Sequence, residues 1–112
     1  MVRHIVMWSI LGSTLAEKQR NIQLVRDCFL GLRGTIPGLT SLEIGVDVSK
    51  VDYACDVVLN SEFESWEALE GYATHPAHLQ VRDRLAGVRI ARHQVDYEIH
   101  HAPEQQAGAM TP

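Results

Sequence analysis

The sequence predicts an α+β domain of the ferredoxin-like type, with the element order β-α-β-β-α-β and a four-stranded antiparallel sheet. Two observations support this prediction. Four segments show the alternation or the β-branched apolar runs of strands, and two regions show the spacing or the amphipathic character of helices, in that order. The chain of 112 residues, 46% of them hydrophobic, is long enough for one such domain.

The first strand is expected over residues 2–8, where both sides are mostly apolar and should therefore both be covered. Ser13 or Thr14 is expected to cap a helix, and Glu17, three residues after Thr14, completes a capping box. The helix is expected over residues 15–32. Its apolar stripe recurs at a spacing of three and four residues, at Ile22, Val25, Phe29 and Leu32.

Two further strands follow a turn at residues 36–39, which contain Pro and Gly. Residues 41–48 alternate between polar and apolar, which indicates a half-exposed or edge strand. A loop is expected at residues 50–53. Residues 55–63 form the next strand, with alternate residues from Cys55 to Phe63 on one side of it.

Pro76 marks a junction between two helices. Proline has no N–H and is favoured in the first turn of a helix, so one helix should end near Thr74 and another should start at Pro76. The last strand is expected within residues 89–100. The folded domain is therefore predicted over residues 1–100. Residues 101–112, rich in Ala, Gln, Gly and Pro without periodicity, are expected to form a flexible tail.

Composition excludes several classes of partner. The formal charge of −4 argues against a nucleic-acid partner, because phosphate binding needs a basic face. The densest basic set is interrupted by Asp83 and consists of Arg82, Arg84, Arg89 and Arg92. Cys28 and Cys55 are expected to stay reduced. No run has the length of a membrane span and no signal-peptide pattern is evident, so no membrane partner and a cytoplasmic location are expected.

A homodimer is expected from the predicted layers. Helices would cover one face of the sheet, and the other face carries enough apolar residues to need a cover. The chain has no element left to supply that cover. A second copy of the sheet is the simplest one, which predicts a symmetric dimer.

The stretch from Tyr72 to His78 is the strongest candidate for a functional site, because it brings two imidazoles and a phenol together. On a helix, His78 shares a face with Val81, Arg82 and Leu85, so it should point inward. Histidine changes its charge near neutral pH, which makes His78 a candidate base. The other interpretation is a buried histidine with a structural hydrogen bond only.

Neither a metal nor a cofactor is predicted. His75 and His78 are three residues apart, but a proline lies between them and no other metal motif accompanies them. The sequence has no glycine-rich dinucleotide motif and no phosphate-binding loop. Any chemistry is therefore expected to come from the side chains.

Several short motifs together resemble the stress-responsive dimeric α/β-barrel (Dabb) family, over residues 2–99. They are His4-Ile5-Val6, Ile36-Pro37-Gly38-Leu39, Tyr53 to Asp56, Phe63-Glu64-Ser65, Tyr72-Ala73-Thr74-His75-Pro76-Ala77-His78 and Val95-Asp96-Tyr97. The resemblance implies a homodimer whose two sheets face each other as a barrel. It does not by itself assign an activity, because a fold does not determine a function.

The Tyr-x-x-His-Pro-Ala-His run also resembles the olivetolic acid cyclase branch of that family, which performs an aldol condensation of a linear tetraketide. That resemblance implies His78 as the base and Tyr72 as a residue that helps to hold the substrate. It implies His4 as a second histidine of the same cavity and Asp96 as the residue that orients the base.

The substrate pocket is expected between the sheet and the helices, with a partly apolar lining: Val6, Trp8, Leu24, Cys28, Val57 and Leu59. This chain departs from the cyclase branch at three of these positions. Val57 replaces a cavity histidine, Trp8 replaces a smaller aliphatic residue, and Cys28 replaces a tyrosine.

Three functions are consistent with these features. The first is an acid-base enzyme without a cofactor that acts on a small carbonyl compound, in the manner of a polyketide cyclase. The second is a non-catalytic, stress-related or small-ligand-binding dimer in which the same residues are structural. The third is a cofactor-free monooxygenase or isomerase of the related dimeric barrels. Turnover that depends on His78 would separate the first and third from the second.

Overall fold

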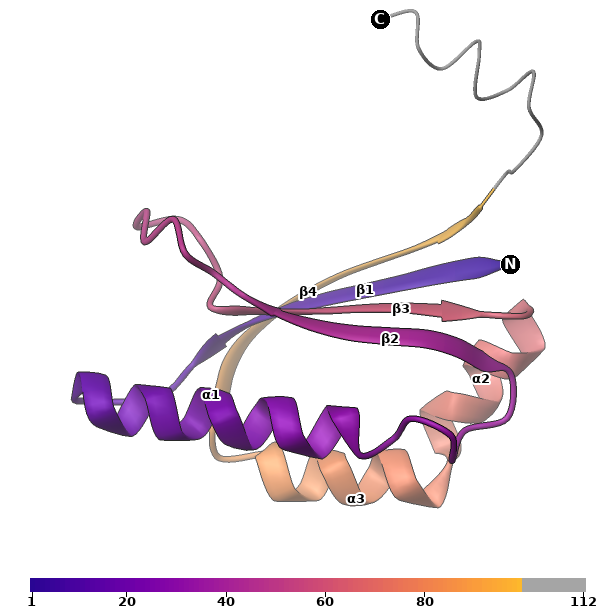
Figure 1. The fold of residues 1–112 in the computed structure, drawn as a ribbon, viewed down its shortest axis with the longest axis horizontal. Coiled ribbons are helices and arrows are strands. Elements are labelled where there is room, and N and C mark those ends of the chain that lie inside the picture. Colours follow the sequence, from indigo (N-terminus) through magenta and orange to yellow (C-terminus); the bar gives the residue numbers. More distant parts are fainter. Residues whose placement is uncertain (100–112) are drawn as a thin grey trace, which may run out of the picture.

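The computed structural model describes residues 1–99 and shows the predicted ferredoxin-like fold (Figure 1). The predicted tail at residues 101–112 lies outside the described residues. The four strands form one sheet in the order β2-β3-β1-β4, and each neighbouring pair is antiparallel. The elements are β1 (Val2–Ile10), α1 (Leu15–Leu30), β2 (Leu39–Val46), β3 (Val57–Phe63), α2 (Trp66–Thr74), α3 (Pro76–Leu85) and β4 (Arg89–Glu98).

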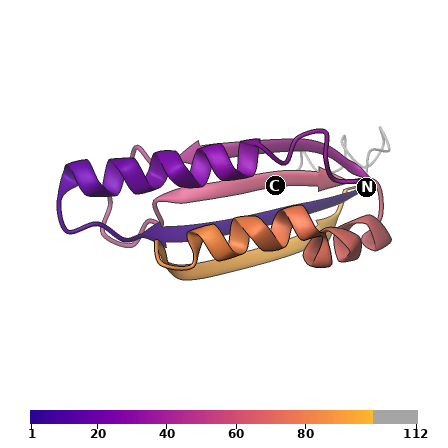
Figure 2. The same ribbon diagram turned by 90° about the horizontal axis from the view of Figure 1, so that it is seen from below.

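The helices cover one face of the sheet only. Figure 2, seen from the helical side, shows α1 over β2 and β3, and α3 over β1 and β4. The core lies between these two layers, because strand side chains alternate between the faces. Its most buried members include Val6, Val25, Phe29, Leu59, Phe63 and Leu85. Within the described residues, no helix is both long and apolar enough to cross a membrane.

Helix α1 begins where the capping pattern predicts. The Thr14 hydroxyl accepts a hydrogen bond from the Glu17 N–H at 3.1 Å, and the Ser13 hydroxyl donates to the Glu17 carboxylate at 3.1 Å. The helix ends at Leu30, two residues earlier than the apolar stripe predicts. Leu32 is nevertheless buried, because the turn after the helix points it into the same core.

Strands β2 and β3 end or begin differently from the prediction because of aspartates. The Asp47 carboxylate accepts hydrogen bonds from the N–H groups of Ser49, at 3.2 Å, and Lys50, at 2.9 Å, which turns the chain and ends β2 at Val46. The Asp56 carboxylate accepts from the Ile10 N–H at 2.7 Å and lies 3.0 Å from the Lys18 ammonium group. Asp56 therefore ties the loop to β1 and α1, and β3 begins at Val57, two residues later than predicted.

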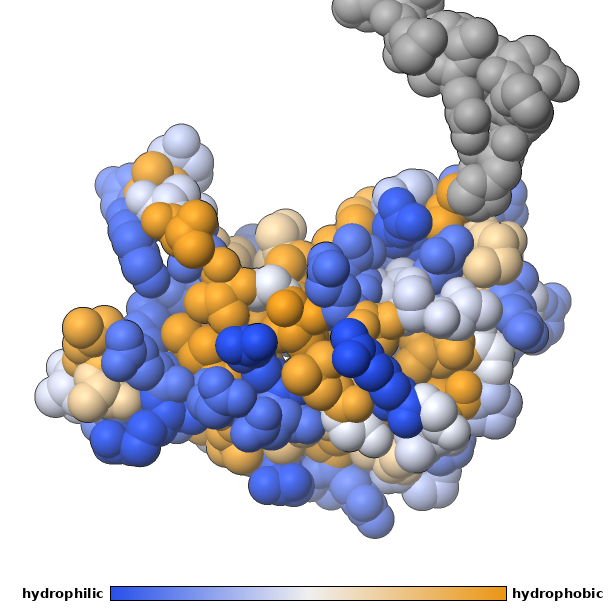
Figure 3. Space-filling model, in the orientation of Figure 1, coloured by the Kyte–Doolittle hydropathy of each residue, from blue (hydrophilic) through white to orange (hydrophobic). Residues whose placement is uncertain are grey.

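Strand β2 forms an edge of the sheet, as its alternating pattern predicts. On this side of the molecule, apolar surface is visible between the sheet and α1, crossed by hydrophilic side chains (Figure 3). Partly buried apolar residues pack there against the core, including Ile22, Leu39 and Ile44. The Arg33 guanidinium group donates two hydrogen bonds to the Leu42 carbonyl, at 2.6 and 3.1 Å, and so satisfies one acceptor of the exposed edge.

The junction at Pro76 is as predicted, and His75 forms it. His75 is extended, with φ −65° and ψ 135°, and it ends α2 and precedes the first residue of α3. Its Nδ1 accepts a hydrogen bond from the Ala77 N–H at 3.0 Å, so the imidazole caps α3. Pro76 occupies the first turn, where its missing N–H costs nothing. The change of direction between α2 and α3 (Figure 1) places Tyr72 and His78 side by side.

The second face of the sheet has no helix over it. The strand register places alternate residues there, among them Ile5, Met7, Val58, Val95 and Tyr97. Met7, Val95 and Tyr97 are 39%, 53% and 41% exposed. An apolar sheet face of this kind usually marks an interface.

Candidate active site

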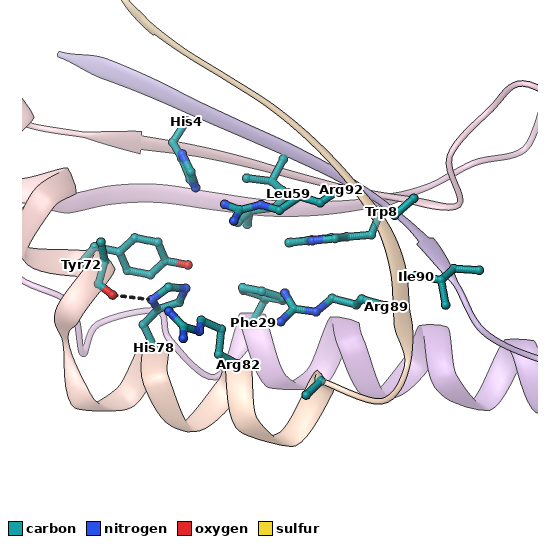
Figure 4. A pocket seen from close by; sticks show the side chains of 14 residues that line it. His4, Trp8, Phe29, Leu59, Tyr72, His78, Arg82, Arg89, Ile90 and Arg92 are labelled. Atoms are coloured by element: carbon teal, nitrogen blue, oxygen red, sulfur yellow. Dashed lines mark hydrogen bonds between the residues drawn. The ribbon is translucent and has the colours of Figure 1, made fainter.

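A cavity of about 480 Å³ lies between the helix-facing side of the sheet and the helices α2 and α3 (Figure 4). Cavities of this size are typical of small-molecule sites. Its polar side chains are His4, Tyr72, His78, Arg82, Arg89 and Arg92. Its apolar side chains include Val6, Trp8, Phe29, Leu59 and Ile90. No acidic side chain lines it among the described residues.

His78 and Tyr72 form the catalytic candidate in the helical layer. Their ring centroids are 4.2 Å apart, and both rings face the cavity (Figure 4). His78 Nδ1 lies 3.2 Å from the Ala73 carbonyl oxygen, which can only accept a hydrogen bond. The proton of the neutral imidazole therefore sits on Nδ1, and the lone pair sits on Nε2.

Burial lowers the pKa of His78, and the charges of Arg82, His4 and Arg89 lower it further, while the hydrogen bond to Ala73 opposes them. Near neutral pH the imidazole is thus mostly uncharged, which is the form that accepts a proton. The favoured tautomer and the lowered pKa together suit His78 for the role of a base.

Tyr72 remains a neutral phenol. Burial raises the pKa of its hydroxyl far above the usual value, although Arg89 and Arg92 partly oppose this effect. Its ring packs against Phe63, with centroids 5.2 Å apart, and its hydroxyl points into the cavity (Figure 4). A neutral phenol in this position can donate a hydrogen bond to a ligand oxygen.

His4 and Asp96 form a second polar pair, on the sheet. They are opposite each other in the register of β1 and β4, and His4 Nδ1 lies 2.5 Å from Asp96 Oδ1. The expectation that Asp96 orients His78 is therefore wrong, because the carboxylate is bonded to His4 and His78 is bonded to the Ala73 carbonyl in its own layer. His4 is buried, and its ring approaches Tyr72 edge to face, with centroids 6.0 Å apart.

The apolar wall of the cavity contains three of the six predicted pocket residues. Trp8 stacks on Phe29, with centroids 5.0 Å apart and an interplanar angle of 22°. The structure places Val6, Trp8 and Leu59 on the wall, as predicted for the pocket. The other three predicted pocket residues, Leu24, Cys28 and Val57, do not line it. The Trp8–Phe29 stack fills the space on the α1 side, and Cys28 and Val57 belong to the packed core.

The sequence analysis missed the cavity arginines and Phe29. Arg82 follows His78 by four residues on α3, and this shared face was the one signal that could have placed it. Arg89 and Arg92 come from the start of β4. Phe29 was assigned to the helical stripe, and it both packs in the core and lines the cavity. Among residues 1–99, no group of three or more His, Cys, Asp or Glu side chains is arranged to hold a metal ion.

Comparison with known families agrees with this architecture. The model of the stress responsive A/B barrel domain (Dabb) matches residues 2–99. The chain belongs to this family. No curated protein matches the chain at a significant level.

Several solved structures share the fold. A dimeric protein of unknown function from Bacteroides fragilis is 27% identical, with a TM-score of 0.78, over 88% of this chain and 95% of that one. A dimeric ferredoxin-like protein from Thermobifida fusca is 18% identical, with a TM-score of 0.75, over 88% and 90%. A hydroxynitrile lyase from Passiflora edulis is 17% identical, with a TM-score of 0.75, over 90% and 94%. The fold of this chain therefore also occurs in proteins described as dimeric and in at least one enzyme.

Proposed function

We propose that this Dabb domain is an enzyme that removes a proton next to the carbonyl group of a small substrate, with His78 as the base. The observation that carries the proposal is the environment of His78. Its Nδ1 is bonded to the Ala73 carbonyl, its Nε2 lone pair is left for a substrate, and the phenol of Tyr72 lies beside it. A histidine with these properties suits general-base catalysis near neutral pH.

The reaction needs one proton acceptor and one hydrogen-bond donor. His78 Nε2 takes the proton from the carbon next to the carbonyl. The electron pair of that C–H bond forms a C=C bond, and the π pair of the carbonyl group moves onto its oxygen. The neutral Tyr72 hydroxyl donates a hydrogen bond to this oxygen, where negative charge develops. The imidazolium of His78 can then return the proton to the carbon. Alternatively, the enolate carbon attacks a second carbonyl carbon, so that a C–C bond forms as the C=O π bond breaks, and the imidazolium protonates the resulting alkoxide. This second outcome is the addition step of an aldol condensation.

The His4–Asp96 pair is proposed to support this step from the sheet. The Asp96 carboxylate favours a proton on His4 Nδ1 and fixes the plane of the ring. His4 Nε2 is then the nitrogen left to contact a ligand in the cavity that both histidines line. Asp96 acts through His4, so it is a positioning residue rather than a catalytic one.

The Tyr-x-x-His-Pro-Ala-His run supports a cyclase-like reaction among the carbonyl chemistries. The Trp8–Phe29 stack shortens the apolar end of the cavity, which favours a compact substrate over one with a long alkyl chain. The domain is further proposed to work as a homodimer, joined through the uncovered sheet face. The apolar residues exposed there and the dimeric structures of similar proteins support this assembly.

Proton exchange tests the proposal without knowledge of the natural substrate. Acetone, acetoacetate and phenylpyruvate are incubated with the protein in D₂O, and NMR records the replacement of the protons next to the carbonyl group. At least one probe should exchange faster than in buffer, and His78→Gln should lower that rate by about 10²–10⁴-fold, the usual contribution of a general base. His75→Asn is the matched control, because asparagine also caps a helix and His75 does not line the cavity. Exchange that His78→Gln leaves unchanged would refute the assignment.

A further inference from the structure

None of the cavity arginines is paired with an acid among residues 1–99, and the acids Glu70 and Asp96 line an adjoining pocket instead. Three arginines line the cavity, and the ion pairs among residues 1–99 involve other groups: Arg3 with Glu62, His4 with Asp96, and Lys18 with Asp56. Asp96, the acid nearest in sequence to Arg92, accepts hydrogen bonds from His4 and from the Gln94 amide, at 2.9 Å for the latter. The cavity is therefore positive in a chain whose formal net charge is −4.

The three guanidinium groups come to the cavity from two elements, α3 and β4. Arg82 extends from α3, and Arg89 and Arg92 extend from the first residues of β4 toward the space into which the Tyr72 hydroxyl points (Figure 4). Arg89 is half-buried, and Arg82 and Arg92 are exposed at the opening. Burial lowers the pKa of Arg89, and the charges of Arg92 and Arg82 lower it further. An anion placed among them would relieve this repulsion.

Arg89 is held in position before any ligand binds. Its guanidinium carbon lies 5.1 Å from the centroid of the Trp8 ring and 6.0 Å from that of Phe29, which is the range of cation–π contacts. The Arg92 guanidinium donates to the side-chain oxygen of Gln94. A guanidinium fork fixed in this way matches the two oxygens of a carboxylate or a phosphate.

We propose that the cavity binds an oxyanionic group of its substrate, a carboxylate or a phosphate, through Arg82, Arg89 and Arg92. Arg82 lies one helical turn after His78, so the anion site and the base belong to the same cavity. The anion would fix the substrate while its carbonyl group faces His78 and Tyr72. The substrate class is thus a small carbonyl compound that carries a negative charge. The inference that the substrate has a carbonyl group rests on the proposed function, and the inference of an anion site does not.

Binding of three small probes to the full-length protein tests this inference. Benzoate, phenyl phosphate and benzamide have the same ring, and differ in carrying a carboxylate, a phosphate or a neutral amide. Isothermal titration calorimetry at constant ionic strength should show one or both anions bound at least ~10-fold more tightly than benzamide, because hydrogen bonds to charged groups contribute about 1.5–3 kcal/mol. The anion that binds more tightly shows whether the substrate's oxyanionic group is a carboxylate or a phosphate.

Substitution of the arginines assigns the site. Arg89→Gln should weaken anion binding by at least ~10-fold and leave benzamide binding nearly unchanged, and Arg82→Gln should act in the same direction. Arg84→Gln is the matched control, because Arg84 lies on the same helix, is exposed, and does not line the cavity. Circular dichroism of each variant checks the fold, and Arg82→Gln carries the test if Arg89→Gln does not fold.

The result that overturns the inference is separate from failure of the proposed function. Absence of binding by both anions, equal binding of benzamide, or anion binding unaffected by either arginine substitution would refute the anion site. His78→Gln should retain the anion affinity within a factor of ~3, since it removes no guanidinium donor. Anion binding without proton exchange would leave the site in place and refute the catalysis. Proton exchange without selectivity for anionic probes would support the catalysis and refute the anion site.

Discussion

His4 of β1 and Asp96 of β4 are direct partners across two neighbouring strands, with His4 Nδ1 2.5 Å from Asp96 Oδ1. The pair faces the helices, on the same side of the sheet as the cavity. One strand register thus links the packing of the sheet to the orientation of a cavity imidazole. The pair also explains why a buried histidine is tolerated at the centre of a four-stranded sheet, since its donor has an acceptor.

Asp96→Asn should therefore affect both stability and turnover. The change removes a charged acceptor from a buried imidazole, and we expect the free energy of unfolding to fall by about 1.5–3 kcal/mol. The rate of proton exchange should also fall, but less than with His78→Gln, because the His4 tautomer is no longer fixed. Urea unfolding and exchange rates measure the two effects. Asp83→Asn, on the exposed side of α3, is the control. An unchanged exchange rate would mean that His4 takes no part in the reaction.

The lowered pKa of His78 predicts the pH dependence of the reaction. The neutral imidazole is the base, so the exchange rate should rise as the pH increases through the pKa of folded His78 and level off above it. That midpoint should lie below the usual value of 6.5. NMR titration of the His78 ring gives the same midpoint independently. A midpoint at or above 6.5 would contradict the effects of burial and of Arg82.

The free energy of unfolding should also depend on the protonation of His78. The unfolded chain takes up the His78 proton at a higher pH than the folded protein does, so the contribution of His78 to stability is present above the unfolded pKa and is lost as the pH falls through the folded pKa. We expect the free energy of unfolding to decrease over that interval. His78→Gln should remove this part of the pH dependence, and denaturation curves at several pH values would detect it.

The fold was predictable because its signals are local. The Thr14–Glu17 capping pattern, the stripe through Phe29 and the proline at the α2–α3 junction each act within a few residues. The partner of Asp96 was not predictable in this way. The partner of Asp96 depends on which strand lies beside β4 and on the register of that pair. The alternation of residues within one strand predicts neither of these.

The arginines escaped prediction for a different reason. Most positions of β4 are polar or exposed on both sides, so no apolar face shows which side chains point toward the helices. Arg92 and Arg84 look equivalent in the sequence. The register of β4 against β1, with Arg92 opposite Trp8, places Arg92 at the cavity. Arg84 lies on α3 and does not line the cavity.

A charge on the uncovered sheet face should disrupt the proposed homodimer. Val58 lies on this face, opposite Met7 in the register of β1 and β3. Val58→Asp would bury an unpaired carboxylate between two sheets, at a cost of at least about 3 kcal/mol. Sedimentation equilibrium should show a dimer for the unchanged protein and monomer or unfolded chain for the variant. Val48→Asp, at a side chain that is 89% exposed, should leave the dimer intact. A stable monomer of the unchanged protein at micromolar concentration would contradict the assembly.

Trp8 should limit the size of the substrate. Its ring is buried against Phe29 and closes the apolar end of the cavity, so Trp8→Leu should leave a space there. Loss of this packing should lower the free energy of unfolding by about 2–4 kcal/mol, measured by urea denaturation. The space should also accept a longer alkyl chain, and octanoate should gain affinity relative to butyrate in the variant. Arg89 also loses its aromatic neighbour, so butyrate itself should bind more weakly. Loss of stability without any change in the octanoate-to-butyrate ratio would show that Trp8 supports the core but does not set the length of the ligand.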